Sequence, residues 1–224
     1  MRAVQTPRVK VCCISTPAEA ELAIRHGVVA VGLVSSMPSG PGVIAEDVIA
    51  TIAARVPPGV ASFLLTSLQE PDAIIAQQRR CGATTLQLVD RLDHGAYPRL
   101  RAALPGIGLV QVIHVGGVES LAEAVAVAPL VDALLLDSGN QELPVKELGG
   151  TGRVHDWSVS RTIREAVEVP LYLAGGLTPE NVTEAIATVA PFGLDVCGGV
   201  RVAGQLDATR LARFMAAVRA VSPA

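Results

Sequence analysis

Three side chains capable of acid–base or nucleophilic chemistry stand where apolar segments of this sequence end. Cys12 and Cys13 close one such segment, and Asp137 closes another, the run Ala133–Leu136. A cysteine thiolate is a nucleophile and a base. A carboxylate at the end of an apolar strand is costly to bury unless it is paired or serves as an acid or base. These residue types therefore point to proton transfer, provided that the fold brings them to one site.

Each of these residues also has a purely structural interpretation. Side chains alternate along a strand, so we expect only one of Cys12 and Cys13 to face a site at the strand end. Most unpaired cysteines are small buried hydrophobes, and position alone favours that interpretation here. Asp137 could cap the following loop through Ser138 or Gly139. For Asp137 we favour the chemical role, because burial of an idle carboxylate is expensive.

Eight short apolar segments alternate with amphipathic segments along the chain, as strands alternate with helices. The expected strands are Val9–Cys13, Val29–Val34, Ala61–Leu65, Thr85–Val89, Leu109–Val115, Ala133–Asp137, Pro170–Ala174 and Gly193–Cys197. The expected helices are Ala18–His26, Ala45–Arg55, Asp72–Cys81, Tyr97–Ala103, Glu119–Ala128, Ser158–Glu168, Asn181–Val189 and Ala208–Val221. Gly27 and Gly82 stand at expected helix ends, and Pro17, Pro71 and Pro179 near expected helix starts, which supports this division.

Strands that alternate with helices predict right-handed βαβ units and a parallel sheet. Eight units without a composition break favour a closed barrel over an open sheet of five or six strands, and no GxGxxG follows the first strand. We therefore expect an α/β protein with a single (β/α)8 TIM barrel that occupies residues 1–224 as one domain. In such barrels the chemistry lies in the loops that follow the strands.

Glycine clusters follow three of the later strands. Gly175-Gly176 and Gly198-Gly199 come after strands seven and eight, where backbone N–H groups commonly hold a phosphate in barrels. A further cluster, Gly149–Gly152, follows strand six. We expect phosphate binding at the last two strands. His114, near the end of strand five, is interpreted as a satisfied rim residue, and no histidine spacing indicates a metal site.

Composition excludes several other classes of function. The net charge of −3, with one Trp, two Tyr and three Phe, gives neither the basic surface nor the stacking platforms that nucleic-acid binding uses. Mean hydropathy is high at +0.45, but the longest apolar stretch, Ala124–Leu136, contains Pro129 and Asp132 and is shorter than the roughly 20 residues of a membrane span. A sheet buried on both faces explains the hydropathy better. With no secretory signal and no CxxC pair among four cysteines, we expect a cytoplasmic protein.

The chain resembles the phosphoribosylanthranilate isomerase family from about Val9 to Phe214. The resemblance is carried by VKVCCIS (Val9–Ser15), VDALLLDS (Val131–Ser138), GGTGRVHDW (Gly149–Trp157), LAGGLTPENVTEAI (Leu173–Ile186) and GLDVCGGV (Gly193–Val200). It implies a cofactor-free Amadori rearrangement of a phosphorylated aminoaldose to an aminoketose in tryptophan biosynthesis. By the same resemblance, Asp137 is the general acid that opens the ribose ring and Cys12 is the general base that removes the C2 proton.

The sequence departs from the family pattern at four places. Cys13 stands where the family has Gly, and Gly40–Gly42 replaces a Ser-Pro-Arg whose arginine holds the anthranilate carboxylate. Gln87–Asp90 replaces Gln-Leu-His-Gly, and Cys197–Arg201 replaces Ser-Ser-Gly-Val-Glu. The acid, the base and the phosphate site are retained, while the aromatic end of the substrate site is changed.

The lost cation leaves its replacement and the substrate open. Arg91 is the first candidate to take its place, with Arg153 and Arg201 as further ones, and Arg201 could also add charge at the phosphate site. One alternative is a paralogous isomerase for another phosphorylated sugar. Another is a barrel that binds a phosphorylated metabolite without catalysis, although retention of Cys12 and Asp137 argues against it. Neither a cofactor nor a metal is expected, and the sequence does not give the oligomeric state.

Overall fold

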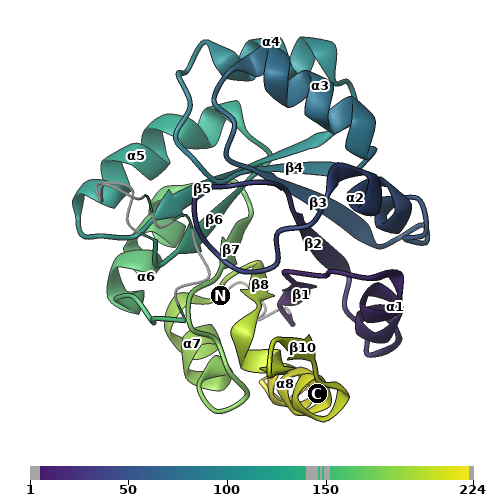
Figure 1. Cartoon of the computed structure of the whole chain (residues 1–224). Coiled ribbons are helices and arrows are strands. Elements are labelled where there is room, and N and C mark those ends of the chain that lie inside the picture. Colours follow the sequence, from purple (N-terminus) through teal and green to yellow (C-terminus); the bar gives the residue numbers. More distant parts are fainter. Residues whose placement is uncertain (1–5, 140–145, 147, 149–151, 222–224) are drawn as a thin grey trace.

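Eight parallel strands close into a barrel in the computed structural model of this chain, which describes residues 6–139, 146, 148 and 152–221. The strands follow one another around the barrel in sequence order, and the first pairs with the last (Figure 1). The expected (β/α)8 fold is therefore confirmed. A two-stranded antiparallel hairpin adds to the barrel after the eighth strand.

Helices and strands alternate, with bounds close to those expected from the sequence. The barrel strands are β1 Arg8–Val11, β2 Ala30–Val34, β3 Ala61–Thr66, β4 Thr85–Leu88, β5 Gly108–His114, β6 Ala133–Asp137, β7 Leu171–Leu173 and β8 Gly193–Val196; the hairpin strands are β9 Arg201–Val202 and β10 Gln205–Leu206. The α-helices are α1 Pro17–Arg25, α2 Glu46–Ala53, α3 Pro71–Cys81, α4 Ala96–Ala103, α5 Glu119–Val127, α6 Trp157–Ala166, α7 Val182–Val189 and α8 Ala208–Ala220; two 3₁₀ turns are η1 Ala128–Leu130 and η2 Gly198–Val200. Most ends differ from the expected ones by a residue or two, which is the usual uncertainty of helix and strand limits.

Local chemistry accounts for several of these limits. Pro17 and Pro71 occupy the first turns of α1 and α3, where a missing N–H costs nothing. Thr16 caps α1 by accepting a hydrogen bond from the N–H of Glu19. Gly82 ends α3 in the left-handed conformation, at φ 65°.

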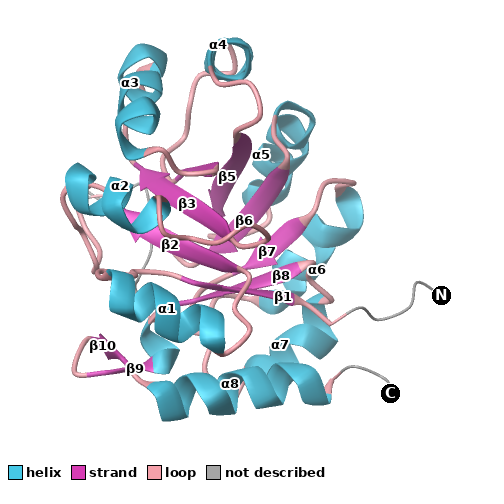
Figure 2. Cartoon of the chain, turned by 90° about the vertical axis from the view of Figure 1, so that its right-hand side faces the viewer, coloured by secondary structure: helices cyan, strands magenta, loops and turns pink. Residues whose placement is uncertain are grey.

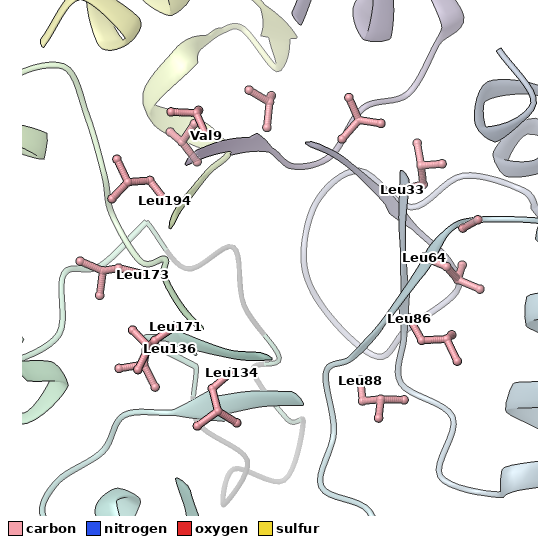
Figure 3. Close-up of a cluster of buried hydrophobic side chains, with 14 of the residues drawn as sticks. Val9, Leu33, Leu64, Leu86, Leu88, Leu134, Leu136, Leu171, Leu173 and Leu194 are labelled. Carbon is pink, nitrogen blue, oxygen red and sulfur yellow. The ribbon is translucent and has the colours of Figure 1, made fainter. Parts of the chain in front are cut away.

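Two hydrophobic layers hold the barrel together. The outer layer packs the outward side chains of the strands (Figure 3) against the helices that surround the barrel (Figure 2). The inner layer fills the barrel with side chains that include Phe63, Leu65, Val110, Leu135 and Tyr172. Both faces of each strand are therefore buried, which explains the continuous apolar runs in the sequence. Within the described part of the chain, no helix combines the length and apolar character that a membrane crossing requires.

Candidate functional site

A cavity of about 970 Å³ opens where the loops that follow the strands converge. Its lining includes the predicted acid and base and both predicted glycine pairs: Cys12, Asp137, Gly175, Gly176, Gly198 and Gly199. The structure thus brings together residues that lie up to 187 positions apart, from Cys12 to Gly199. Residues 149–151 of the other predicted glycine cluster lie outside the described residues, and Gly152 lines the cavity.

Asp137 is the last residue of β6 and pairs in register with His114 on β5. Burial raises the pKa of its carboxyl group, and the hydrogen bond from the Ser138 N–H and the nearby charge of His114 offset this in part. Asp137 Oδ1 accepts that N–H at 2.7 Å. The predicted capping contact is therefore present, and the carboxyl still lines the cavity. A carboxyl group whose pKa is raised holds its proton to higher pH, which suits it to donate that proton to a substrate.

His114 ends β5, and the expectation of a fully satisfied core or rim histidine holds for only one of its ring nitrogens, because its buried Nδ1 has no hydrogen-bond partner among the described residues. Its Nε2 lies 2.9 Å from the backbone carbonyl oxygen of Val89, so this side of the ring is satisfied. It does not line the main cavity.

Cys12 follows β1, and its N–H continues the ladder to β8 by donating to the carbonyl oxygen of Val196 at 2.8 Å, so its side chain lies on the same face of the barrel as that of Lys10. Gly32 on β2 makes room for both side chains. A Cβ added at Gly32 would lie 2.9 Å from Cys12 Sγ and 2.9 Å from Lys10 Nζ. The thiol and the ammonium group therefore approach the same point of the barrel interior, and this explains a glycine in the middle of an apolar strand.

A buried ion pair that the sequence did not reveal lies at the cavity, which its acidic member Asp195 lines. Lys10 Nζ is 2.8 Å from Asp195 Oδ2, and the lysine side chain is 0% exposed. Burial by itself would lower the pKa of Lys10, but the Asp195 carboxylate raises it, so the lysine stays charged. Its ammonium group also lies 5.3 Å from the ring centroid of Phe63. One feature of the sequence could have indicated this ion pair: Lys10 lies between Val9 and Val11 in a buried strand, and a buried lysine needs an anionic partner.

Loss of one partner from this ion pair should destabilise the fold strongly. We expect Lys10→Met to lower the free energy of unfolding by about 3–5 kcal/mol, because Asp195 would be left as a buried, unpaired carboxylate. The double variant Lys10→Met/Asp195→Leu should recover most of that loss. Urea denaturation measures both values. A loss in the single variant no larger than that in the double variant would contradict this role of the pair.

Cys13 also lines the cavity, so the expectation that only one of the two cysteines faces it is wrong. Strand β1 ends at Val11, and Cys13 adopts φ 61°, in the left-handed region. Strand alternation no longer applies beyond the end of the strand. The turn instead directs the Cys13 side chain toward Pro41, whose carbonyl oxygen lies 3.5 Å from Sγ. Glycine adopts this left-handed conformation without strain. Glycine is also the residue that the family pattern has at position 13.

The Cys13 side chain occupies the space beside Gly42, so two of the departures from the family pattern are coupled. A Cβ at Gly42 would lie 2.5 Å from Cys13 Cβ and 3.0 Å from Cys13 Sγ. Gly42 also has φ +81°. A side chain at position 42 is therefore excluded while position 13 carries one, and the sequence alone gave no sign of this.

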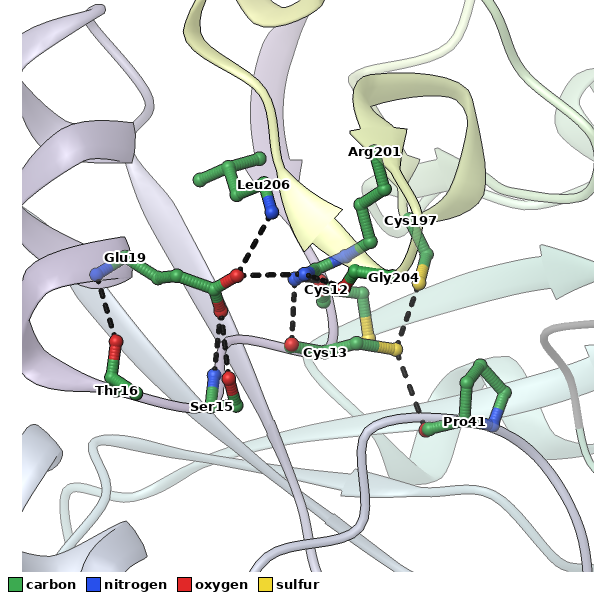
Figure 4. Close-up of polar contacts among 10 residues, drawn as sticks. All are labelled: Cys12, Cys13, Ser15, Thr16, Glu19, Pro41, Cys197, Arg201, Gly204 and Leu206. Carbon is green, nitrogen blue, oxygen red and sulfur yellow. Dashed lines mark hydrogen bonds and ion pairs between the residues drawn. The ribbon is translucent and has the colours of Figure 1, made fainter.

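Arg201 lines the cavity but is held by the protein itself (Figure 4). Its Nη1 donates to Glu19 Oε1 at 2.8 Å, and its Nη2 donates to the backbone carbonyl oxygens of Cys12 at 3.1 Å and Cys13 at 2.6 Å. Both partners of the ion pair are nearly buried, with 9% of the Arg201 side chain and 10% of the Glu19 side chain exposed. Arg201 therefore fixes the backbone that carries the two cysteines.

Glu19 anchors this arrangement from α1. Burial would raise the pKa of its carboxyl group, but hydrogen bonds from the Leu206 N–H, Arg201 and the Ser15 N–H lower it, so the group is anionic. These contacts tie α1 to the hairpin β9–β10 and to the loop after β1. The hairpin was not expected from the sequence, because its strands are only two residues long.

Arg91 lies away from the main cavity, which corrects its expected place at the mouth. Its guanidinium forms an ion pair with Glu123, with Nη2 and Oε2 2.7 Å apart, and it borders a separate cavity of about 80 Å³. The loop after β4 directs the side chain outward toward α5. Of the two further candidates, Arg153 does not line the main cavity either, whereas Arg201 does.

Glycines after β7 and β8 allow close backbone approaches, of the loop after β7 to the loop after β6 and of the loop after β8 to the loop after β7. Gly175 and Gly176 adopt φ 85° and 62°. A Cβ at Gly176 would lie 2.8 Å from the backbone of Arg153, and a Cβ at Gly199 would overlap the carbonyl oxygen of Leu177. Only glycine fits such positions without displacement of backbone.

The remaining lining includes a polar group that the sequence analysis did not single out. Gln87 on β4 is buried, lines the cavity, and has an Oε1 atom with no hydrogen-bond partner among the described residues. It can accept a hydrogen bond from a ligand hydroxyl. Among the described residues, no group of three or more His, Cys, Asp or Glu side chains is arranged to hold a metal ion.

This fold and site define a (β/α)8 barrel in which a buried carboxyl group, a thiol and glycine loops share one cavity at the C-terminal ends of the strands. The family model for N-(5'-phosphoribosyl)anthranilate isomerase matches residues 9–217. The isomerase of Methanocella arvoryzae is 34% identical over 95% of this chain and 98% of its own length, and that of Haloferax volcanii is 36% identical over 95% and 93%.

Solved structures give the same result. A phosphoribosylanthranilate isomerase in complex with reduced 1-(o-carboxyphenylamino)-1-deoxyribulose 5-phosphate superimposes with a TM-score of 0.79 at 25% identity, covering 96% of this chain and 99% of that one. The chain belongs to the N-(5'-phosphoribosyl)anthranilate isomerase family. It is thus an aldose–ketose isomerase of tryptophan biosynthesis, and the family resemblance in its sequence is confirmed.

Proposed function

We propose that the chain converts N-(5'-phosphoribosyl)anthranilate into the corresponding aminoketose phosphate, with Asp137 as general acid and Cys12 as general base. The observation that carries these roles is that both side chains line one cavity together with the glycine loops after β7 and β8. The cavity, about 970 Å³ in volume, is large enough for a substrate of this size. The names of the related proteins supply the substrate.

Ring opening is the first step. Asp137 donates its proton to the ribose ring oxygen, the bond from that oxygen to C1 breaks, and the amine lone pair forms the C1–N double bond of an iminium. The raised pKa of Asp137 supports this role, because the group still holds a proton where an exposed carboxyl would have lost it. Asp137 is left as a carboxylate, and the neighbouring charge of Lys10 favours that form.

Proton removal from C2 is the second step. Cys12, as the thiolate, takes the C2 proton, and the electrons of that C–H bond form a C1–C2 double bond while the iminium nitrogen becomes a neutral amine. This enolamine then takes a proton at C1 and loses one from the C2 hydroxyl, which gives the ketone. The charge of Lys10, which interacts with both Cys12 and Asp137, balances the anions formed during the cycle.

The phosphate group is best placed between the loops after β7 and β8. Gly175, Gly176, Gly198 and Gly199 all line this part of the cavity. Backbone N–H groups that no side chain shields can donate to phosphate oxygens at close range. The cations Arg201, Arg210 and Arg213 line the same cavity and add positive potential around the anion. Arg201 and Arg213 add less of this potential than Arg210, because Glu19 and Glu180 balance their charges and the Nη atoms of Arg201 already donate to the protein.

The anthranilate end of the substrate lies, in this proposal, against Cys13 and Gly42. A charge-assisted contact of the kind the family arginine makes is worth about 1.5–3 kcal/mol. We expect Gly42→Arg alone to lower stability without a gain in kcat/KM, because Cys13 fills the space for its Cβ. The double variant Cys13→Gly/Gly42→Arg should exceed Cys13→Gly in kcat/KM by up to roughly 10- to 150-fold, a gain reduced by the strain of an arginine at φ +81°.

Steady-state kinetics and thermal melting of the single and double variants test this coupling. Arg91→Ala is the matched control for an arginine outside the cavity and should leave kcat/KM unchanged. A Gly42→Arg single variant that melts like the wild type and gains activity would show that Cys13 does not block the position.

Turnover of N-(5'-phosphoribosyl)anthranilate by the purified chain tests the proposed function, with the loss of anthranilate-type fluorescence as the signal. We expect turnover that is absent from a preparation of the Cys12→Ser/Asp137→Asn double variant made in the same way. Equal rates in the two preparations would overturn the proposal.

We also propose that residues 1–224 form one domain and that the protein acts in the cytoplasm. The closure of β1 onto β8 joins the two ends of the barrel, which supports a single domain. The four cysteines are free thiols, as is usual in a reducing compartment.

A further inference from the structure

Two thiols that the proposed mechanism does not use lie side by side at the rim of the barrel. Cys13 follows β1 and Cys197 follows β8, and their Sγ atoms lie 2.8 Å apart (Figure 4). Both residues line the same cavity as Cys12 and Asp137. Nothing in the proton transfers at Asp137 and Cys12 calls for this pair.

The backbone around the two cysteines brings the sulfurs together and holds them. Strands β1 and β8 are hydrogen-bonded neighbours up to the pair Val11 and Val196, so the residues that follow them start side by side. The left-handed turn at Cys13 then directs its side chain toward Cys197. Arg201, four residues after Cys197, donates to the Cys13 carbonyl oxygen and fixes this geometry.

We propose that Cys13 and Cys197 form a reversible disulfide when the protein meets a peroxide, and that this bond switches off the active site. The disulfide needs the sulfurs to approach from 2.8 Å to about 2.05 Å, a movement that the loops after β1 and β8 can make. The proposal adds a modification site to the isomerase activity and does not require that activity for its chemistry.

The reaction begins at Cys197. Its thiol is the more accessible of the two, since Cys13 is buried and Cys197 only half-buried. The hydrogen bond with Cys13, together with the charge of Arg201, lowers the pKa of Cys197. The pKa of Cys13 is raised instead, by its hydrogen bonds with Cys12 and Cys197 and by burial. Cys197 is therefore the nucleophile, and Cys13 is the resolving thiol.

Both steps balance with one equivalent of hydrogen peroxide. The Cys197 thiolate attacks one peroxide oxygen, the O–O bond breaks, and the sulfur becomes a sulfenic acid while the other oxygen leaves as hydroxide, which takes a proton to become water. Cys13 then attacks the Cys197 sulfur, the S–S bond forms, and the sulfenic oxygen leaves as a second water with the Cys13 proton. Two thiols are oxidised and one peroxide is reduced to two waters.

The bond should slow the isomerase because it displaces the backbone next to the proposed base. Cys12 precedes Cys13, and Arg201 holds the carbonyl oxygens of both. A misplacement of about 1 Å in an active site can cost roughly 10²-fold in rate. This consequence rests on the proposed role of Cys12, whereas formation of the bond does not.

Peptide mapping of the full chain after peroxide treatment tests the proposal. Without reduction, trypsin should release Val11–Arg25 joined to Glu165–Arg201, two hydrogens lighter than the sum of the two peptides, and dithiothreitol should separate them. Cys13→Ser and Cys197→Ser should each abolish the joined product. Cys12→Ser should retain it, and so should the matched control Cys81→Ser, whose thiol is fully buried in α3 and has a pKa raised to about 11 by burial.

The outcomes separate this proposal from the proposed function. Turnover of the oxidised wild type, compared with the same sample after dithiothreitol, should be lower by roughly 10- to 100-fold. Loss of the joined product in Cys12→Ser, or oxidation that stops at sulfinic acid on Cys12, would overturn the assignment of the pair. A joined product with unchanged turnover would overturn the switch. Failure of the wild type to turn over the substrate would leave the mapping result unaffected.

Discussion

Asp137→Asn is expected to lower kcat for N-(5'-phosphoribosyl)anthranilate by about 10²–10⁴-fold with little change in binding. The amide has nearly the same size as the carboxyl group but has no acidic proton to donate to the ring oxygen. It can still accept the Ser138 N–H hydrogen bond, so the loop after β6 should keep its place. Rates at saturating substrate, together with the thermal melting temperature as a control for folding, measure the effect.

The proposed role of Asp137 also predicts the direction in which kcat changes with pH. Burial raises the pKa of Asp137, so the wild type should remain active above the ordinary pKa of a carboxyl group and lose activity as pH rises through the shifted value. The alkaline decline should be absent from the residual activity of Asp137→Asn. A variant that retains full turnover and the wild-type pH profile would remove Asp137 from the mechanism.

Cys12→Ser is the second substitution expected to have a very large effect, again about 10²–10⁴ in kcat. A serine hydroxyl is far less acidic than a thiol, so it does not supply the anionic base for the C2 proton. The matched comparison is Cys13→Ser, which changes the neighbouring thiol in the same cavity. Cys13 is not in line with Lys10 and Cys12 on the β1 face, and its loss should cost much less turnover.

The two cysteine variants must be assayed under reducing conditions, so that the Cys13–Cys197 pair does not contribute. Near-normal turnover in Cys12→Ser, with a severe loss in Cys13→Ser, would show that the base is Cys13 and not Cys12. Lys10 would then be expected to act on Cys13 instead, since its charge interacts with both thiols.

The barrel could be predicted from the sequence because its physical requirements repeat eight times. Each buried strand requires an apolar run, and each crossover requires an amphipathic helix with its own start and stop residues. Pro17, Pro71 and Gly82 mark helix limits within a residue or two of the structure. The short hairpin β9–β10 escaped prediction because two-residue strands carry no periodic pattern.

Site residues could be predicted where the end of a strand places them in the cavity. They could not be predicted where the direction of a long side chain decides whether it reaches the cavity. Asp137 and Cys12 reach the cavity because the barrel directs every strand end to one rim. The sequence does not show that Arg91 turns outward to Glu123 or that Arg201 turns inward to the carbonyl oxygens of Cys12 and Cys13. Long side chains take the partner that the tertiary structure provides.

Contacts between residues far apart in the sequence could not be predicted either. Lys10 with Asp195 and Cys13 with Cys197 are separated by about 185 residues, and neighbouring residues give no sign of either contact. Both pairs exist because β1 and β8 close the barrel. A sequence that predicts a closed barrel therefore also predicts that the end of the first strand lies beside the end of the last strand. Charged residues and cysteines at these two strand ends can be paired on that basis.

A crystal structure of this chain with reduced 1-(o-carboxyphenylamino)-1-deoxyribulose 5-phosphate, the compound bound in a related isomerase, tests the central claim most directly. We expect the phosphate between Gly175-Gly176 and Gly198-Gly199, the sugar C2 within reach of Cys12 Sγ and the Asp137 carboxyl, and the carboxyphenyl ring toward Cys13 and Gly42. A phosphate bound away from both glycine loops, or a sugar that touches neither Cys12 nor Asp137, would contradict the account.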